Sequence, residues 1–526
     1  MKNHVCLLAL AAATTCAAHA AQDRFFYAAR HCTNEKAADE TVALVRRAAA
    51  AGYNGLVLAS KFDGLDTWSP QEMANFKKVE AACRETGVEL IPLLWSVGYG
   101  TMLWRNPNLA EGLPLVDVEY TVSGRELVPS STNGVASLDG FKILDRATVE
   151  KTAAGFAFSG FARDKYHHAR ILRHATVKPY TRYVLTGRAR SLGMGEGRST
   201  FLVQGYVGGR HLFFHKPLGR AADGEWVDFS YPVVTGAETA YDLYAGVWGR
   251  PDTADGRAEI ASLDMRECGT GRILRRGGCP LSLRRADDGR ALAEGTDFAF
   301  ARDKSGDSRF TALDGGALKA GDKVLVSGYT IFPVKSGTQI PVCMCEEELY
   351  DYFARNAQAI EKAFSPRRWF LSMDEIRLGG TCQACRSRDT DMAHILGDCV
   401  RRQREIIRRV HPDAQIYIWG DMFNPWVNAR EHYMLTRGSF KDSLSLLPKD
   451  MIIADWNGAT WDRALDLYKK EGFQVLGCTY YDGKDLNGRA RHDVDAAAGK
   501  DNVRGYMYTT WQSKYDLLED FAKMIP

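Results

Sequence analysis

The stretch Trp369-Phe-Leu-Ser-Met-Asp-Glu-Ile-Arg377 decides the fold class. An apolar run ends abruptly in two adjacent acids, Asp374 and Glu375, and Gly379-Gly380 follows. A buried parallel strand reads as a continuous apolar run. Acids directly after such a strand would lie at the C-terminal mouth of an α/β barrel, where the catalytic residues of barrel enzymes lie. The stretch therefore predicts an enzyme with these two carboxylates as the first candidates.

Strands and helices alternate on both sides of this stretch. The expected strands lie at 25–29, 53–59, 88–95, 367–374, 414–420, 450–456, 474–480 and 503–510. The expected helices lie at 35–51, 70–87, 346–364, 394–410, 460–471, 485–498 and 514–524. Successive β-α units form parallel sheets with right-handed crossovers. Eight such strands predict a (β/α)8 TIM barrel.

The pattern changes between the third and fourth expected barrel strands. Short alternating runs and many glycines follow one another there, for example at 183–189, 201–206 and 241–247. Strands at short, regular spacing with turn residues predict an antiparallel β-sandwich inserted after the third strand. The predicted division is a signal peptide at 1–20, the first part of the barrel at 21–115, the inserted β-sandwich at 116–279 and the remainder of the catalytic barrel at 280–526.

The first residues predict export. Lys2 precedes an apolar run at 5–13, and Ala18-His19-Ala20 fits a small-x-small cleavage site. We therefore expect a secreted or periplasmic protein with a cleavable signal peptide and no later membrane span. The net charge of +3 is small and the basic residues are dispersed, so nucleic acid is not expected as a partner. The 11 Trp residues weakly favour sugar binding.

Ten of the 12 cysteines follow the predicted signal peptide, and two pairs are tightly spaced. These pairs are Cys343-Met-Cys345 and Cys382-Gln-Ala-Cys385. Export permits disulfides, and four thiolates could also hold structural zinc. Because this spacing is not that of a standard zinc ribbon, disulfides or buried free thiols are favoured over zinc. No metal and no cofactor are predicted.

Polar and aromatic residues recur where the expected barrel strands end. In strand order these are Arg30-His31, Trp95, Asp374-Glu375, Trp419-Gly-Asp421, Asp455-Trp456-Asn457, Tyr480-Tyr481-Asp482 and Trp511-Gln512. One such residue is more often a packing residue or a helix N-cap than a site residue. Seven such groups, each at the end of a different expected strand, predict that these residues line one substrate-binding mouth.

Carboxylates with aromatic neighbours suit glycoside cleavage, in which an acid protonates the leaving oxygen. A partly apolar pocket would help such an acid to keep its proton. In a two-carboxylate mechanism Glu375 would be the acid, with Asp421, Asp455 or Asp482 as nucleophile or base. A different class of function is a non-catalytic glycan-binding protein, and Asp374 and Glu375 could also be a helix-capping pair.

The strand-end motifs resemble those of family 20 glycoside hydrolases, the β-N-acetylhexosaminidases. Asp374-Glu375 resembles the family's Gly-Gly-Asp-Glu signature, and Ala29-Arg30-His31 resembles its first-strand Arg-His, where the Arg holds sugar hydroxyls. Tyr480-Tyr481-Asp482 resembles its Tyr-Leu-Asp, and Trp511-Gln512 resembles its Trp-x-Glu. The residues that fall where the family supplies pocket walls are Trp419, Asp421 and Trp456. The insert resembles carbohydrate-binding sandwich modules.

This resemblance implies substrate-assisted retention. Glu375 would be the general acid/base, Asp374 would orient the substrate's 2-acetamido group, and Tyr480 would hydrogen-bond the acetamido oxygen. The implied substrates are N-acetylhexosaminides, such as glycoprotein or mucin-type glycans. Ser372-Met373 stands where the family has two glycines, and Gln512 stands where it has an acid.

Overall fold

The computed structural model describes residues 22–130, 134–195, 200–208, 210–218, 223–249, 255–335 and 339–526. The signal peptide predicted at 1–20 lies outside these residues. Within the described ranges, no helix is both long enough and apolar enough to cross a bilayer.

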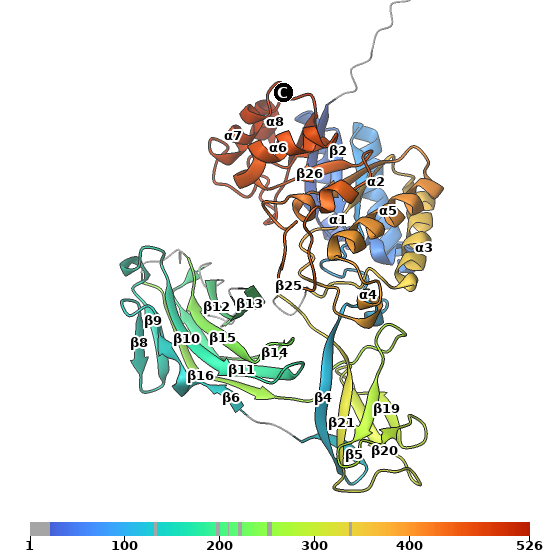
Figure 1. The fold of residues 1–526 in the computed structure, drawn as a ribbon. Coiled ribbons are helices and arrows are strands. Elements are labelled where there is room, and N and C mark those ends of the chain that lie inside the picture. Colours follow the sequence, from blue (N-terminus) through green and yellow to red (C-terminus); the bar gives the residue numbers. More distant parts are fainter. Residues whose placement is uncertain are drawn as a thin grey trace, which may run out of the picture.

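Eight parallel strands close into a barrel, in the order β1-β2-β3-β22-β24-β26-β27-β28. Two of them, β2 and β26, are labelled in Figure 1, with the barrel helices around them. The bounds of the eight strands are β1 Asp23–Ala29, β2 Gly55–Ala59, β3 Glu89–Leu94, β22 Arg368–Leu371, β24 Gln415–Trp419, β26 Ile452–Asp455, β27 Gln474–Gly477 and β28 Val503–Tyr508. The predicted TIM-like barrel is therefore confirmed, and its third and fourth strands are separated by a long insertion.

Helices cover the outside of the barrel, and local signals define their ends. They are α1 Glu35–Ala50, α2 Pro70–Thr86, α3 Glu347–Phe364, α5 Met392–Val410, α6 Trp461–Lys470, α7 Arg489–Ala496 and α8 Leu518–Met524. The α2 helix shows such signals at both ends. Ser69 and Glu72 form a capping box, and Gly87 ends the helix in the left-handed conformation at φ 73°.

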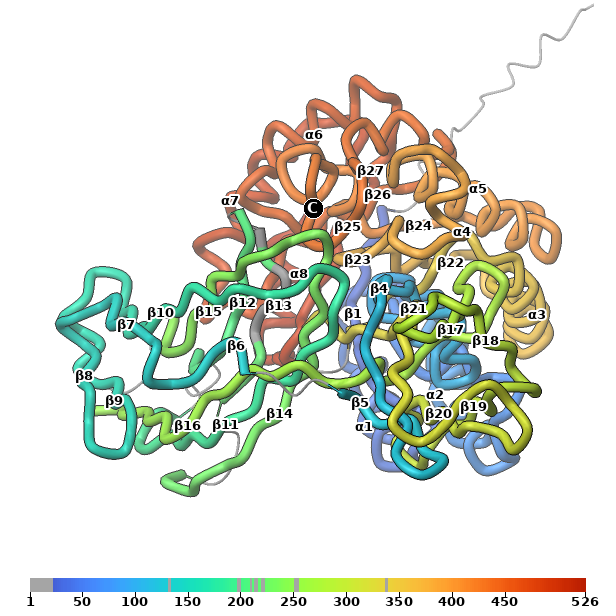
Figure 2. The backbone as a smooth tube through the Cα atoms, turned by 60° about the horizontal axis from the view of Figure 1, so that its bottom comes forward, coloured from blue at the N-terminus to red at the C-terminus, as the bar shows by residue number. Residues whose placement is uncertain are grey.

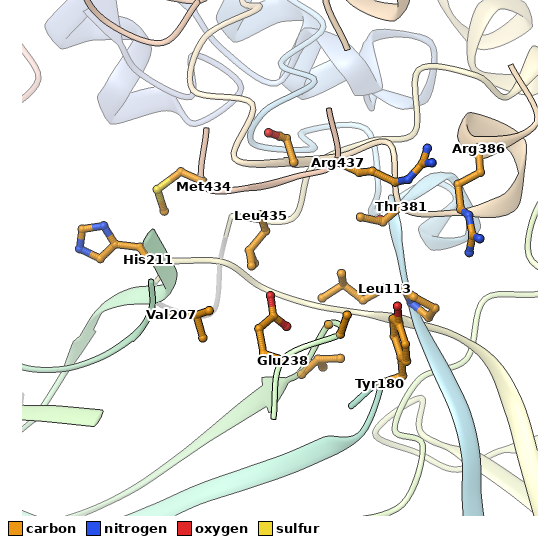
Figure 3. A pocket seen from close by; sticks show the side chains of 15 residues that line it. Leu113, Tyr180, Val207, His211, Glu238, Thr381, Arg386, Met434, Leu435 and Arg437 are labelled. Atoms are coloured by element: carbon orange, nitrogen blue, oxygen red, sulfur yellow. The ribbon is translucent and has the colours of Figure 1, made fainter. Parts of the chain in front are cut away.

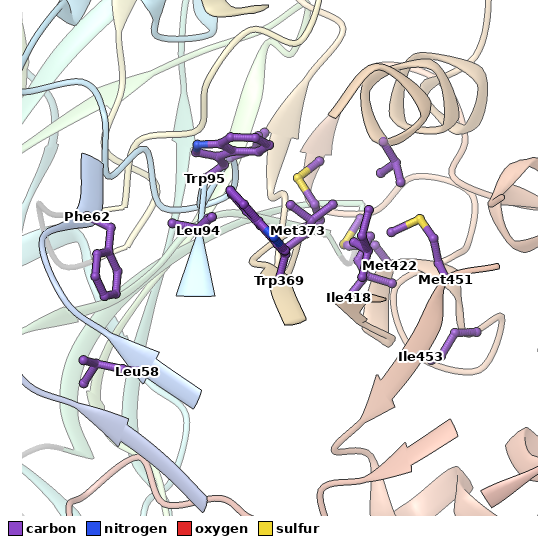
Figure 4. Packing of buried hydrophobic residues seen from close by; sticks show 14 of the residues in the cluster. Leu58, Phe62, Leu94, Trp95, Trp369, Met373, Ile418, Met422, Met451 and Ile453 are labelled. Atoms are coloured by element: carbon purple, nitrogen blue, oxygen red, sulfur yellow. The ribbon is translucent and has the colours of Figure 1, made fainter. Parts of the chain in front are cut away.

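The barrel interior is packed rather than open. The inward side chains form one cluster that includes Phe25, Tyr27, Phe370, Tyr417 and Trp419. A second, larger cluster fills the space between the strands and the helices (Figure 4). Because side chains fill the barrel, a substrate can reach this part of the molecule only at the mouth formed by the strand ends.

Asp23 holds charged side chains together at the opposite, N-terminal end of the barrel. Its fully buried carboxylate accepts a hydrogen bond from the Tyr417 hydroxyl at 2.6 Å and from Arg504 Nε at 3.1 Å. Arg368 Nη2 lies 3.3 Å from the other oxygen. Polar residues at this end of a barrel contribute to stability rather than to catalysis.

Asp23→Ala should lower the free energy of unfolding by about 3 kcal/mol, because it leaves two partly buried arginines without their shared counter-charge. Urea unfolding followed by tryptophan fluorescence measures this loss. The control is Asp501→Ala, since Asp501 is exposed and its ion pair among the described residues is with Lys469, a contact worth at most about 1 kcal/mol. Equal midpoints for the two variants would contradict the assigned role.

Two antiparallel sheets with a shared hydrophobic core follow the third barrel strand. We call this part the two-sheet domain. One sheet has the order β13-β12-β15-β10-β7, and the other has the order β14-β11-β16-β9-β8, with β6 paired to β16. The bounds are β6 Gly134–Ser137, β7 Lys142–Ile143, β8 Val149–Thr152, β9 Gly155–Ser159, β10 Ala169–Thr176, β11 Arg182–Leu192, β12 Phe201–Val207, β13 Arg210–Pro217, β14 Val227–Val234, β15 Ala240–Val247 and β16 Arg257–Glu267.

A third sheet lies beside the two-sheet domain and has its own core. Its order is β18-β17-β21-β4-β5-β20-β19, and its strands are labelled in Figure 2. Its strands are β4 Gly112–Ser123, β5 Glu126–Pro129, β17 Ser282–Arg285, β18 Ala291–Leu292, β19 Phe298–Arg302, β20 Ser308–Ala312 and β21 Lys323–Ile331. This differs from the predicted division, which gave residues from 280 onward to the barrel. The pairing of β4 with β21 joins segments far apart in sequence, which local patterns do not reveal.

Two loops at the barrel mouth reach toward the two-sheet domain (Figures 1 and 2). The loop after β22 contains β23 Leu378–Gly379 and the short helix α4 Gln383–Arg386. The loop after β24 contains β25 Leu435–Thr436, which pairs in parallel with β23. The segment that carries Asp374 and Glu375 is therefore anchored on both sides.

Candidate active site

A cavity of about 310 Å³ opens at the C-terminal mouth of the barrel. It is lined by side chains from the ends of several strands and from two loops of the insertion. The lining residues are Tyr99, Lys335, Asp374, Glu375, Trp456, Tyr481, Asp482, Trp511 and Gln512. The cavity combines three carboxylates with accessible aromatic rings, which is the chemistry predicted for the strand ends.

The backbone of Glu375 is held in an uncommon conformation. Its φ is 49°, a left-handed value that non-glycine residues rarely adopt outside turns and functional sites. The Glu375 N–H donates to Asp421 Oδ2 at 2.9 Å, and its carbonyl accepts from Gln339 Nε2 at 3.0 Å. These two bonds fix the direction in which the Glu375 side chain leaves the strand.

The Glu375 carboxylate has two partners of its own. Arg377 Nη2 lies 2.5 Å from Oε1, and the Tyr99 hydroxyl donates to Oε2. Arg377 in turn donates to Gln339 Oε1 at 2.5 Å. One guanidinium and one phenol therefore hold the Glu375 side chain in place at the cavity.

Asp374 and Asp421 form the rest of the acidic cluster. Burial and the neighbouring Glu375 raise the pKa of Asp374 to about 6, against the opposing hydrogen bond from Ser372 Oγ at 2.9 Å. Burial and the proximity of Asp374 raise the pKa of Asp421 well above its ordinary value. Three adjacent carboxyls do not all ionise easily, so part of the cluster keeps a proton in mildly acidic solution.

A glycine makes room for the Asp374 backbone. A Cβ at Gly98, which follows the third barrel strand, would overlap the carbonyl oxygen of Asp374 and touch that of Glu375. Gly98→Ala should therefore shift the acidic pair and lower kcat at least about tenfold, since small misplacements at a reacting centre are costly. Gly134→Ala is the control, because its Cβ would meet open space. Wild-type kcat in Gly98→Ala would contradict this packing argument.

Three aromatic rings form the opposite walls of the cavity. Trp456 and Tyr481 stack with ring centroids 5.9 Å apart, and Trp511 meets Trp456 edge-on at 6.4 Å. Trp511 is 39% exposed and Tyr481 is 42% exposed, so ring faces remain accessible. Large, exposed aromatic faces in a concave site provide contact area for an amphipathic ligand such as a sugar.

Asp482 connects the end of β27 to the end of β28 through hydrogen bonds. Its carboxylate accepts from Thr510 Oγ1 at 2.5 Å, from the Trp511 N–H at 2.9 Å and from the Gln512 N–H at 3.3 Å. Asp482 itself has a left-handed φ of 55°. Much of its hydrogen-bonding capacity is therefore used to position Trp511 at the cavity.

Two predicted site residues point away from the cavity, and their predictions are corrected. Trp95 is fully buried among the outer helices, where it stacks on Phe353 at 4.5 Å (Figure 4). Tyr480 stacks on Tyr508 at 4.2 Å and donates its hydroxyl to the carbonyl of Gly483 at 3.1 Å. Consecutive side chains of an extended segment face opposite ways, so it is Tyr481 that lines the cavity.

Three further predicted residues lie near the mouth without lining this cavity. Arg30 forms a 2.5 Å ion pair with Glu40, and Trp419 packs inside the barrel 4.6 Å from Phe370. Asp421 is fully buried beneath Glu375. Trp419 and Asp421 thus support the site from below, and the Arg30 side chain is engaged by a helix.

Tyr99 and Lys335 were missed by the sequence reasoning. Both lie in connections of the insertion rather than at barrel strand ends, so the strand-end pattern could not indicate them. Burial and the nearby Arg377 lower the pKa of Lys335. The insertion therefore contributes directly to the site.

A second cavity, of about 290 Å³, lies between the two-sheet domain and the loop at 434–437 (Figure 3). Its lining includes His211, Glu238, Arg386 and Arg437. Glu238 is the one acid among its described lining residues. The paired carboxylates that glycoside cleavage needs are thus found at the barrel mouth rather than here.

Comparisons with known proteins find similarity among solved structures. No protein-family model and no curated protein matches the chain. A β-N-acetylhexosaminidase has a TM-score of 0.27 at 12% identity, over 36% of this chain and 45% of that one. The β-N-acetylhexosaminidase of Bacteroides fragilis has a TM-score of 0.25 at 14% identity, over 36% and 42%.

An inactive mutant of the GH20 exo β-N-acetylglucosaminidase of Vibrio harveyi has a TM-score of 0.31 at 7% identity, over 73% of this chain and 93% of that one. The chain spans less than half the length of the first two structures. At these identities the similarity concerns the fold alone.

Proposed function

We propose that this chain is a glycoside hydrolase in which Asp374 and Glu375 catalyse cleavage at the barrel mouth. One observation carries the proposal. The two adjacent carboxylates share a cavity with the accessible rings of Trp456, Tyr481 and Trp511. Glycoside cleavage needs an acid for the leaving oxygen and a negative group near the oxocarbenium-like centre, and sugar rings need extended walls.

The proposed substrates are N-acetylhexosaminides, cleaved with help from their own acetamido group. The acetamido oxygen attacks the anomeric carbon while the glycosidic C–O bond breaks, and Glu375 gives its proton to the leaving oxygen. Glu375 then takes a proton from water as the water oxygen bonds to the anomeric carbon. The bond between that carbon and the acetamido oxygen breaks in the same step, which restores the acetamido group and releases the sugar. Asp374 orients the acetamido N–H. Tyr481 takes the role first predicted for Tyr480, because its side chain lines the cavity.

A two-carboxylate mechanism is a second candidate within the same reaction class. Of the three acids considered for it, Asp482 is the one that lines the cavity among the described residues. Asp421 is buried beneath Glu375, and Asp455 is buried and accepts from the Tyr468 hydroxyl at 2.9 Å. Because Asp482 already accepts three hydrogen bonds, we favour the substrate-assisted mechanism.

The proposal is tested with a panel of aryl glycosides and mucin-type glycans, chosen because the predicted export would place the protein among such substrates. Wild-type turnover of at least one N-acetylhexosaminide supports the proposal. A non-catalytic glycan-binding protein would instead show no turnover on the whole panel and unchanged glycan binding in Glu375→Gln. Turnover distinguishes the two outcomes, because glycan binding in Glu375→Gln, measured by isothermal titration, is expected to persist in both.

A further inference from the structure

A second group of reactive side chains is buried where the insertion joins the barrel. The ligand atoms of Glu111, Cys343, Cys382 and Cys385 all lie within 4.8 Å of one another. The Sγ atom of Cys343 is 3.4 Å from that of Cys382 and 3.5 Å from that of Cys385. A disulfide would require about 2.05 Å. Thiolates around one zinc ion, with Zn–S bonds of about 2.3 Å, lie roughly 3.8 Å apart in a tetrahedron.

The Glu111 carboxylate is oriented as a ligand would be. Its Oε1 accepts from the Thr381 N–H at 2.7 Å, from the Thr381 hydroxyl at 2.8 Å and from the Cys382 N–H at 2.8 Å. Its Oε2 faces Cys385 Sγ at 3.4 Å. Three donors thus hold one oxygen in place, and the other oxygen is directed at the sulfurs. Such supporting hydrogen bonds are typical of metal-binding carboxylates.

Other groups complete the surroundings. The Cys279 thiol contacts Cys382, and the Cys345 thiol contacts Cys343 and Cys385. Arg276 is buried beside them, donates to the Ala110 carbonyl at 2.6 Å and pairs with Glu346 at 2.7 Å. Three thiolates and a carboxylate around a dication carry net negative charge. A buried arginine at this place offsets part of that charge.

We propose that Cys343, Cys382, Cys385 and Glu111 bind one Zn²⁺ ion in a structural site. Thiolates with a carboxylate suit zinc, and four protein ligands close its tetrahedral shell. The ten described cysteines, including these three, form no disulfide in this structure. The sequence alone favoured disulfides or free thiols, because the spacing of the two cysteine pairs is not that of a standard zinc ribbon and export permits disulfides.

The ion would fasten the insertion to the catalytic loop. Glu111 directly precedes β4, and Cys343 precedes α3. Cys382 is the N-cap of α4 and Cys385 lies within α4, in the loop that carries Asp374 and Glu375. The first two segments already touch, since the Glu111 N–H donates to the Pro341 carbonyl at 2.8 Å. Since the unfolded chain lacks the assembled site, binding energy of the ion adds to folding energy.

Metal analysis of the full-length protein, purified with reductant and without chelator, tests this site. We expect about one zinc per chain, and cobalt in its place should give thiolate-to-cobalt charge-transfer absorption. Cys343→Ser should lower the zinc content more than about tenfold. Cys83→Ser, which changes a buried thiol in α2, should keep the zinc.

A measurement on the wild-type chain covers the case in which Cys343→Ser fails to fold. A thiol-blocking mercurial should release the zinc in step with cysteine modification. A zinc-free chain, an intact mass that shows a disulfide among these cysteines, or two ions per chain would each overturn the four-ligand assignment. Zinc loss is measured as the metal content of the protein, so the test of the zinc site does not depend on whether the chain cleaves glycosides.

Discussion

Glu375→Gln is expected to lower kcat by about 10²–10⁴-fold, the range that general acid/base catalysis contributes. The amide has nearly the same shape but can neither give nor take the proton. Arg377 and Tyr99 would keep the side chain in place, so glycan binding should change little. Initial rates on an aryl N-acetylhexosaminide, together with binding by titration, measure the two effects separately.

The leaving group provides an internal check on the Glu375 role. A substrate whose leaving group needs little protonation should lose less activity in Glu375→Gln than one with a poor leaving group. Glu471→Gln is the matched control, because Glu471 is the partly exposed C-cap of α6 and, among the described residues, forms its ion pair with Lys449. A wild-type rate in Glu375→Gln on every substrate would remove Glu375 from the mechanism.

Asp374→Asn should abolish most activity and stabilise the fold above pH 6. Burial and Glu375 raise the Asp374 pKa from 3.8 to about 6, so the folded protein holds a proton that the unfolded chain has already released. Stability therefore falls as the pH rises from about 4 to 6, and the cost stays at higher pH. At pH 8 the neutral amide should gain about 1–3 kcal/mol over the wild type.

Urea unfolding at pH 4 and pH 8 measures this difference, which should be small at pH 4. Asp466→Asn, an exposed carboxylate paired with Lys500, should show no comparable dependence on pH. Equal stability of Asp374→Asn and wild type at pH 8 would contradict the electrostatic argument.

The loss of the Asp374 proton as the pH rises also distinguishes two possible catalytic roles of Asp374. If the ionised carboxylate orients the acetamido group, kcat/KM should rise as the pH increases through about 6. If Asp374 instead supplied the proton, kcat/KM should fall over the same range. The proposed function requires the first result.

Local sequence signals were sufficient for the barrel. Its strands are continuous apolar runs. The signals that begin and end a helix, such as the Ser69 cap and Gly87 of α2, lie within a few residues of the helix ends. The third sheet was missed because its central pair, β4 with β21, joins segments on either side of the two-sheet domain.

The site was predictable where a strand end sets the direction of a side chain. Trp456, Asp482 and Trp511 line the cavity as the strand-end pattern predicted. The side chains of neighbouring residues point in opposite directions, so Tyr481 lines the cavity and Tyr480 points away from it. Trp95 turns outward because its backbone leaves β3 in the left-handed conformation, at φ 56°, which the sequence does not indicate.

The most direct measurement compares kcat/KM for an aryl N-acetyl-β-hexosaminide with that for the matching aryl β-hexoside that has a 2-hydroxyl. The acetamido group is the nucleophile in the proposed mechanism, and an oriented intramolecular nucleophile is worth many powers of ten. We predict a preference of at least about 10²-fold for the N-acetylated substrate, lost in Asp374→Asn. Equal rates on the two substrates would contradict the substrate-assisted role of Asp374 and Glu375.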